Sequence, residues 1–243
     1  MPCQPVICAE VTIIDDDMVV LLEKTFTVQL ERTVGLDYRI SLEDTPATIT
    51  ITDDDEATVG LDNMTYTVKE DNLQLNVCVV VFSPTTACPI AFPFELIFAA
   101  NQGTAFQGRD YTLNDRAVNF GACSKKECLT VDIIDDDLIE DTETFTITLQ
   151  PPSQDFTERI ILSPNVTTVA IEDEHDATVG LEEMSYEVNE GDSIEVCARV
   201  TSPSISCPIS YGFSLTISTA PINAGFNVVY TSLRIKQVST QCT

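Results

Sequence analysis

Polar and apolar residues alternate through the middle of the chain at the two-residue period of a β-strand. The stretch Thr144-Phe145-Thr146-Ile147-Thr148-Leu149 shows this pattern, and Thr130-Val131-Asp132-Ile133 repeats it. Successive side chains of a strand point to opposite faces, so this period predicts strands with one buried face. No segment keeps a helical period. Seven strands are therefore expected, at about 58–68, 74–82, 89–99, 111–120, 128–134, 144–150 and 166–172.

These strands belong to an internal repeat. Residues 57–61 return at 177–181, and residues 13–17 return at 133–137, each after 120 positions. The chain therefore divides into the C-terminal half of one repeat (1–55), a complete repeat (56–176) and the N-terminal half of a third (177–243). Seven short strands with turns rich in Pro, Asn and Gly predict an all-β fold of tandem immunoglobulin-like antiparallel β-sandwiches, one complete and two partial.

The charge balance narrows the classes of partner. The sequence holds 39 Asp and Glu against 12 Lys and Arg, for a net charge of -27. Such a chain repels nucleic acid and anionic membranes, and no stretch approaches the roughly 20 apolar residues of a membrane helix. His175 is the single histidine, so a Ser-His-Asp arrangement would depend on one residue. We expect no enzymatic activity, no nucleic-acid partner and no direct membrane insertion in this segment.

The acidic residues gather at one pole of the predicted sandwich. If successive strands alternate in direction, the connections after 58–68, 89–99 and 128–134 meet the end of 166–172 at one pole. The acids on these connections are Glu70, Asp71, Asp110, Asp135, Asp136, Asp137, Glu140, Asp141, Glu143, Asp173, Glu174 and Asp176. An acidic run alone is usually a solvated turn. A merely solvated surface, however, would give no reason for the acidic residues to lie at one pole of the sandwich. Oxygen ligands from several flexible loops favour Ca²⁺ over Mg²⁺. One repeat could bind a single ion or more than one.

The same residues carry a resemblance to a known family. The segment from Ile133 to Phe145 reads as an apolar strand end, three Asp, then Glu-x-x-Glu-x-Phe. Gly108-Arg109-Asp110-Tyr111 looks like a Gly-x-Asp-Tyr motif, and Ile171-Glu172-Asp173-Glu174 looks like a closing acidic strand end. In these motifs the chain resembles the Calx-beta domains of sodium-calcium exchangers, integrin β4, giant adhesion receptors and matrix proteins.

The resemblance implies a set of calcium ligands in the middle repeat. They are Glu70, Asp110, Asp135, Asp136, Glu140, Glu143, Asp173 and Glu174, with the Leu138 carbonyl as a backbone ligand. His175 stands where the family often has a third Asp. After Asp17 the first half-repeat has lost most of the second acidic part of the motif, so its site is expected to be weak or absent. In the last half-repeat, Asn227-Val228-Val229-Tyr230 replaces the Asp-Tyr pair.

Nine cysteines and two glycosylation triplets, at Asn63 and Asn165, favour an extracellular or cell-surface setting. Each expected disulfide spans one turn, with two buried thiols as the alternative. The expected disulfides are Cys78–Cys88, Cys123–Cys128 and Cys197–Cys207.

These observations predict a calcium-stiffened spacer or adhesion segment of a larger extracellular matrix or cell-surface protein involved in cell communication. Its partners would be calcium ions, neighbouring Calx-beta repeats and other extracellular proteins. Two alternatives remain: a cytoplasmic calcium-sensing regulatory module of a membrane transporter, and a structural spacer that no longer binds calcium. In either setting the half-repeats should leave an apolar face uncovered.

Overall fold

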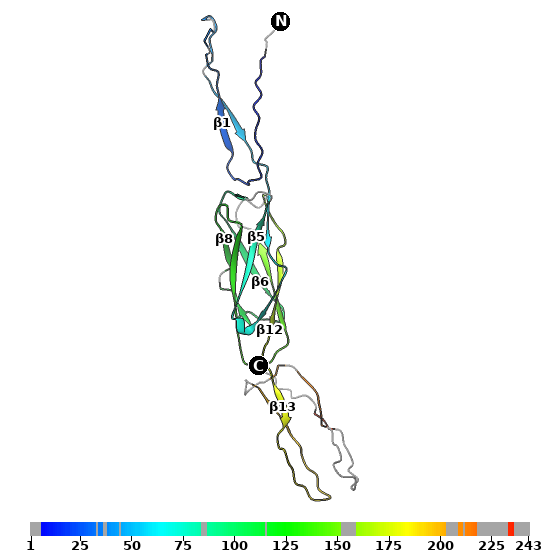
Figure 1. Ribbon diagram of the computed structural model, residues 1–243. Helices are drawn as coiled ribbons and strands as arrows, with labels where there is room; N and C mark the ends of the chain where they lie inside the picture. The colour runs from blue at the N-terminus through cyan, green and yellow to red at the C-terminus, as the bar shows by residue number, and fades with distance from the viewer. Residues whose placement is uncertain are drawn as a thin grey trace.

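The computed structural model describes residues 6–32, 34–35, 38–43, 45–83, 87–114, 116–151, 159–202, 209–210, 212–217 and 233–235. In its middle repeat two five-stranded sheets form a β-sandwich (Figure 1). One sheet has the order β4 (Thr65–Lys69), β12 (Val166–Glu172), β10 (Glu143–Gln150), β6 (Phe94–Gln102), β8 (Ala117–Phe120). The other has the order β11 (Ile160–Leu162), β3 (Ala57–Leu61), β5 (Gln74–Phe82), β9 (Lys126–Ile133), β7 (Tyr111–Thr112).

The predicted all-β sandwich is thus confirmed. Neighbouring strands are antiparallel, except that the edge strands β11 and β4 pair parallel with β3 and β12.

Two of the predicted strands are each divided between the sheets. The stretch 58–68 forms β3 in one sheet and β4 in the other, and the stretch 111–120 forms β7 and β8 in the same way. β3 runs so close to the chain before β12 that a Cβ on Gly60 would lie 2.2 Å from the Ser163 carbonyl oxygen. This close packing holds β3 in the second sheet, and the chain crosses to the first after it. The prediction of single strands there was wrong, and β11 was not predicted.

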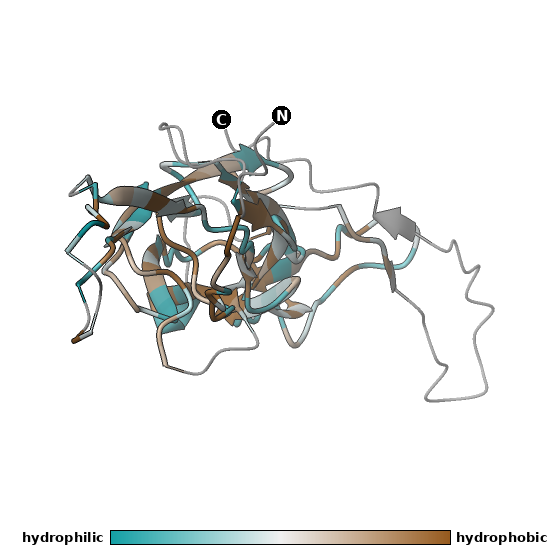
Figure 2. Cartoon of the chain, turned by 90° about the horizontal axis from the view of Figure 1, so that it is seen from above, coloured by the Kyte–Doolittle hydropathy of each residue, from teal (hydrophilic) through white to brown (hydrophobic). Residues whose placement is uncertain are grey.

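The core lies between the sheets and follows the alternation in the sequence. Along β10, Phe145, Ile147 and Leu149 are at most 2% exposed, while their neighbours are more open. The ring of Tyr111 stacks on Phe145 with their centroids 3.7 Å apart, which ties β7 to β10 across the sandwich. Seen from above, brown apolar and teal polar residues mix along the strands (Figure 2). Burial of this apolar set stabilises the repeat.

The terminal repeats lie on either side of the sandwich as hairpins (Figure 1). β1 (Lys24–Val28) pairs with β2 (Ala47–Ile51), β13 (Thr178–Leu181) with β14 (Ala198–Thr201), and β15 (Leu215–Ile217) with β16 (Leu233–Ile235). Large apolar side chains are open there, with Ile14 88%, Leu22 82% and Met184 95% exposed. The half-repeats therefore leave large apolar side chains uncovered, as expected for half sandwiches. Within the described residues, no helix has the length and apolar character required to span a bilayer.

The disulfides join other partners than the ones predicted. The bonds are Cys78–Cys128 and Cys88–Cys123, with Cα atoms 4.0 and 4.3 Å apart. Cys78 lies directly opposite Cys128 in the register of β5 and β9, so two strands distant in sequence are bonded across one sheet. The predicted pairs Cys78–Cys88 and Cys123–Cys128 are therefore wrong. Cys197 is bonded to no described cysteine, and Cys207 lies outside the described residues, so their pairing stays a prediction.

Candidate metal centre

Four connections bring acidic side chains to the same pole of the sandwich. Glu70 opens the short helix η1 (Glu70–Asn72) after β4, and Asp110 directly precedes β7. Glu143 is the first residue of β10, and Asp173 follows β12. Residues 134–142 join β9 to β10 and carry the remaining acids of the predicted set. The strand directions expected from the sequence therefore place the acids as anticipated.

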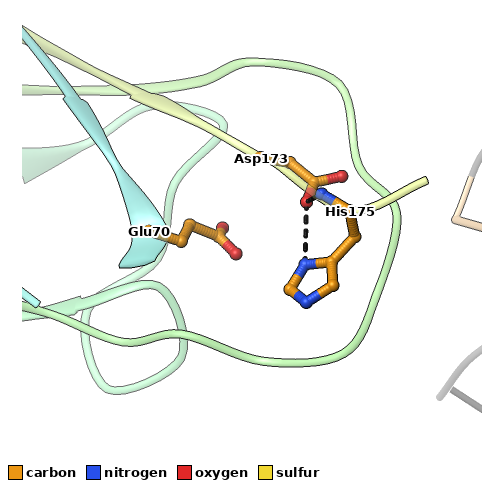
Figure 3. Close-up of side chains that lie close together, drawn as sticks. All are labelled: Glu70, Asp173 and His175. Carbon is orange, nitrogen blue, oxygen red and sulfur yellow. Dashed lines mark hydrogen bonds and ion pairs between the residues drawn. The ribbon is translucent and has the colours of Figure 1, made fainter. Parts of the chain in front are cut away.

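Within this pole the potential ligand atoms fall into three groups. In each group the atoms lie within 4.8 Å of one another. The groups are Glu70, Asp173, His175; Asp135, Glu174, His175; and Asp110, Glu140, Glu143. Figure 3 shows Glu70 pointing from the end of β4 towards Asp173 and His175. The structure thus brings together the predicted carboxylates, apart from Asp136, in groups small enough for one ion each.

Backbone N–H groups hold several of these carboxylates in place. Leu138 N–H donates to Asp136 Oδ1 at 2.7 Å, and Glu140 N–H donates to Asp173 Oδ2 at 2.7 Å. Phe106 N–H donates to Asp110 Oδ2 at 2.6 Å. Each bond fixes the direction of the carboxylate that accepts it. The ligand role of the Leu138 carbonyl stays a prediction.

Two glutamates at the pole, the buried Glu70 and the half-buried Glu143, each have one buried carboxyl oxygen without a hydrogen-bond partner in the described part of the chain. Glu70 is 5% exposed, and Oε2 of Glu70 and Oε2 of Glu143 have no hydrogen-bond partner among the described residues. Burial, followed by the charges of Asp136 and Asp173, raises the pKa of Glu70 to about 7. Burial, followed by the hydrogen bond and charge of Asp110, raises the pKa of Glu143 to about 8. Unpaired buried carboxylates are costly, and a bound cation would supply the missing partner.

Arg109 reaches this cluster but does not balance it. Its Nη2 lies 2.8 Å from Glu140 Oε1 and its Nε lies 3.5 Å from Asp110 Oδ1, with the arginine side chain 52% exposed. The pKa of Glu140 is still raised, because burial outweighs the attraction of Arg109. An exposed guanidinium is screened by solvent and offsets little of the charge of several carboxylates.

His175 is the one member of the cluster that the sequence did not assign to the ligand set. Its Nδ1 lies 3.1 Å from Asp173 Oδ1, and its backbone N–H donates to the same oxygen at 2.8 Å. Burial lowers the pKa of His175, but the hydrogen bond to Asp173 and the charge of Glu174 outweigh it, so the pKa is raised. Its position after Asp173 and Glu174 was the available signal, and the sequence predicted there only a missing third Asp.

The donor set fits a hard divalent cation. Its members are carboxylates with one imidazole, they come from separate loops, and two of their buried oxygens lack partners. Ca²⁺ accepts six to eight oxygen ligands with variable geometry, and such a loop-borne set can provide them. The arrangement is suited to binding an ion.

The first half-repeat has a second acidic cluster, in which lysine and arginine side chains lie beside the carboxylates. Its acids line an open hollow with Lys24 and Val20. The acids are Asp15, Asp16, Asp53, Asp54 and Asp55. Lys24 Nζ lies 3.7 Å from Asp16 Oδ2, and Arg159 Nη1 lies 2.5 Å from Asp53 Oδ2. Protein cations therefore already pair with two of these five carboxylates. The segment 227–230, where the last half-repeat departs from the motif, lies outside the described residues.

Comparison with known proteins gives matches of family and of structure. The Calx-beta domain matches residues 2–55 and 53–175. The structure titled as the apo form of the Calx CBD1 domain is 26% identical, covers 49% of this chain and 99% of its own, and has a TM-score of 0.43. The calcium binding domain CBD12 of CALX1.1 is 25% identical and covers 54% of this chain, with a TM-score of 0.42. The match spans 51% of that protein, and no curated protein matches the chain.

The family match extends over both the acidic motif of the first half-repeat and the complete middle repeat. The resemblance inferred from the acidic motif is therefore confirmed, whereas the boundaries at residues 56 and 176 stay predictions. The chain belongs to the Calx-beta domain family.

Proposed function

We propose that the acidic pole of the middle repeat binds Ca²⁺ and that the ion stiffens a spacer or adhesion segment of a larger extracellular or cell-surface protein. The observation that carries the proposal is the pair of buried, unpartnered oxygens, Glu70 Oε2 and Glu143 Oε2, inside a cluster of carboxylates. Removing charges from water without a counter-ion is unfavourable, so a cation is the natural partner.

The loop from β9 to β10 supports the stiffening part of the proposal. Glu140 N–H binds Asp173 on one side, while the adjacent carbonyl of Ile139 accepts a hydrogen bond from Ser210 N–H at 3.0 Å. One short segment therefore contacts both the predicted ligands and the following repeat. An ion that orders this segment would restrict movement between the two repeats.

Isothermal titration calorimetry on the whole chain tests the ion binding. For an extracellular module we expect a Kd for Ca²⁺ on the order of 10⁻⁴ to 10⁻³ M, with weaker binding of Mg²⁺. Glu70→Gln should remove most of the heat, whereas Glu95→Gln, an exposed carboxylate on β6, should leave it unchanged. Equal heats for Ca²⁺ and Mg²⁺, or equal losses in the two variants, would contradict the proposal.

Two disulfides in the middle repeat support an oxidising compartment, where such bonds persist. Asn63 and Asn165 are exposed, and their glycosylation belongs to the same proposal. Alkylation of the native protein without reductant tests it, since Cys78, Cys88, Cys123 and Cys128 should stay unmodified. Free reaction of these thiols would favour the cytoplasmic sensor instead.

A further inference from the structure

One apolar residue of the first half-repeat is built into the core of the following repeat. Val19, two positions after the acidic run that ends at Asp17, is 0% exposed and belongs to the apolar core of the sandwich. Its N–H donates to the Pro89 carbonyl at 3.0 Å, and its carbonyl accepts from Ala91 N–H at 2.9 Å. Val19 and Ile90 thereby form a parallel β-bridge. Ile14, in the same acidic segment, is by contrast 88% exposed.

The same contact recurs at the next junction. Ile139, two positions after the acidic run that ends at Asp137, is 6% exposed and forms a parallel bridge with Ile209. The Ile139 carbonyl accepts from Ser210 N–H at 3.0 Å, as the Val19 carbonyl does from Ala91. Val19 and Ile139 are 120 positions apart, and Ile90 and Ile209 are 119 apart, so both partners occupy equivalent places in successive repeats.

The segment that Val19 contacts has a sequence that recurs at the next junction, and a disulfide holds it in place. It reads Cys88-Pro89-Ile90 at the first junction, and residues 207–209 have the same three letters. At the first junction Cys88 is bonded to Cys123, and Cys123 N–H donates to the Ile90 carbonyl at 2.8 Å. Ile90 is thus held from one side by Cys123 and contacted from the other by Val19.

A second contact acts at the first junction. Arg159 lies directly before β11 of the sandwich, and its guanidinium pairs with Asp53 at 2.5 Å. Asp53 also accepts from Val20 N–H at 3.1 Å, which connects this pair to the residue after Val19. Two separate points of attachment restrict both bending and rotation between the repeats.

We infer that each repeat recognises the next through one apolar residue of its acidic loop, which bridges to the isoleucine of a Cys-Pro-Ile sequence in the next repeat. In the first junction the Cys88–Cys123 disulfide braces the segment that contains this isoleucine. The partner for this surface is another repeat carrying an apolar residue two positions after its acidic run. At the first junction the contact uses backbone hydrogen bonds and apolar burial and none of the residues of the proposed calcium site, so its test there stands separately from the proposed function.

Amide hydrogen exchange of the whole chain, followed by NMR, tests the docking directly. In the parent protein the amides of Val19 and Ala91 should be protected, because each donates across the junction. Replacing a buried valine by aspartate alters such an equilibrium by roughly tenfold or more. Val19→Asp should accelerate exchange at Ala91 by at least that factor, whereas Ile14→Asp should not. Unprotected Val19 and Ala91 amides in the parent, a result that needs no variant, would overturn the inference.

Removing each of the two disulfides in turn tests whether the Cys88–Cys123 bond supports the docking contact. Cys88→Ser with Cys123→Ser should accelerate exchange at Val19 and Ala91 more than at Val131 in the core strand β9. Cys78→Ser with Cys128→Ser removes the disulfide between β5 and β9 and should accelerate all three amides alike. If the two double variants give the same pattern, the Cys88–Cys123 bond has no special role in docking and that part of the inference fails.

Discussion

The acidic cluster of the middle repeat and that of the first half-repeat share one backbone contact. Glu140 N–H donates to Asp173 at 2.7 Å, and Val20 N–H donates to Asp53 at 3.1 Å, both partners being 120 positions apart. Their surroundings differ. The middle cluster has the buried, unpartnered oxygens of Glu70 and Glu143.

In the first cluster, Val20 stands where the middle repeat has Glu140, and Arg159 and Lys24 pair with the carboxylates. The pKa of Asp55 is raised there by burial, then by the charges of Asp53 and Asp15. The clusters therefore differ less in having a protein cation, since Arg109 reaches the middle one, than in burial. Among the described residues, only the middle cluster has buried carboxylate oxygens without a hydrogen-bond partner.

The largest expected difference between the clusters is in their response to calcium. At about one hundred times Kd, the ion should stabilise the sandwich by about 2.7 kcal/mol and raise its melting temperature by roughly 10 °C. Glu143→Gln should abolish most of this shift, whereas Asp54→Asn in the first cluster should retain it. Calorimetric melting of both variants, with calcium or chelator, checks this. If only Asp54→Asn lost the calcium-dependent shift in melting temperature, the ion would be assigned to the first cluster and not to the middle repeat.

The second difference concerns pH. The folded-state pKa values of Glu70 and Glu143, about 7 and about 8, lie above the ordinary 4.5. The folded form therefore binds protons more tightly, and this contribution is complete below pH 4.5 and is lost as pH rises through 7 to 8. Without calcium, the two groups together should lower the free energy of unfolding by on the order of 5 kcal/mol between pH 5.5 and pH 8.5.

Urea unfolding at the two pH values measures this fall. Glu143→Gln should flatten the pH dependence, and Asp54→Asn should not. Ion-free protein that becomes more stable towards pH 8.5 would contradict the burial of these carboxyl groups in the protonated form.

A smaller effect on the free energy of unfolding is expected from Arg159, which pairs with Asp53 in the first cluster. Arg159→Gln removes a partly buried pair with Asp53 and should cost about 1 kcal/mol of unfolding free energy. Lys126→Gln, which breaks a pair with Asp62 in which the lysine is 52% exposed, should cost less than about 0.5 kcal/mol. Equal costs in thermal unfolding would indicate that the Arg159 pair is an ordinary surface contact.

The smallest effect is expected at Lys24, whose Nζ lies 3.7 Å from Asp16 with both side chains about half exposed. Lys24→Gln should change the unfolding free energy by only a few tenths of a kcal/mol, and added salt should remove the difference. A cost that persists at high salt would indicate a stronger pairing in the first cluster.

The sequence predicted those features that depend on local alternation and strand direction. β10 follows from the pattern of residues 144–150, because every second side chain enters the core. The meeting of the acids at one pole follows from the alternating direction of the strands. The sequence was less informative where the chain changes sheet, since the close contact of Gly60 with Ser163 joins residues far apart in sequence.

Tertiary pairing also explains why the disulfides were mispredicted. Closeness along the chain favoured Cys78 with Cys88, but the register of β5 and β9 places Cys78 opposite Cys128. Likewise, the alternation that predicted a strand from residue 89 gave no sign that Ile90 would bridge to Val19 of the preceding repeat. The sequence did not predict His175 as a member of the acidic cluster, because its closeness to Glu70 depends on the adjacent ends of β4 and β12.

Locating calcium by anomalous diffraction from crystals of the chain grown with the ion tests the central claim most directly. A peak is expected at the pole of the middle repeat, about 2.3 to 2.6 Å from carboxylate oxygens that include those of Glu70 or Glu143. No peak is expected beside Asp53 in the first cluster, where Arg159 already provides the positive charge. Calcium bound beside Asp53 with none at the middle pole would contradict the account.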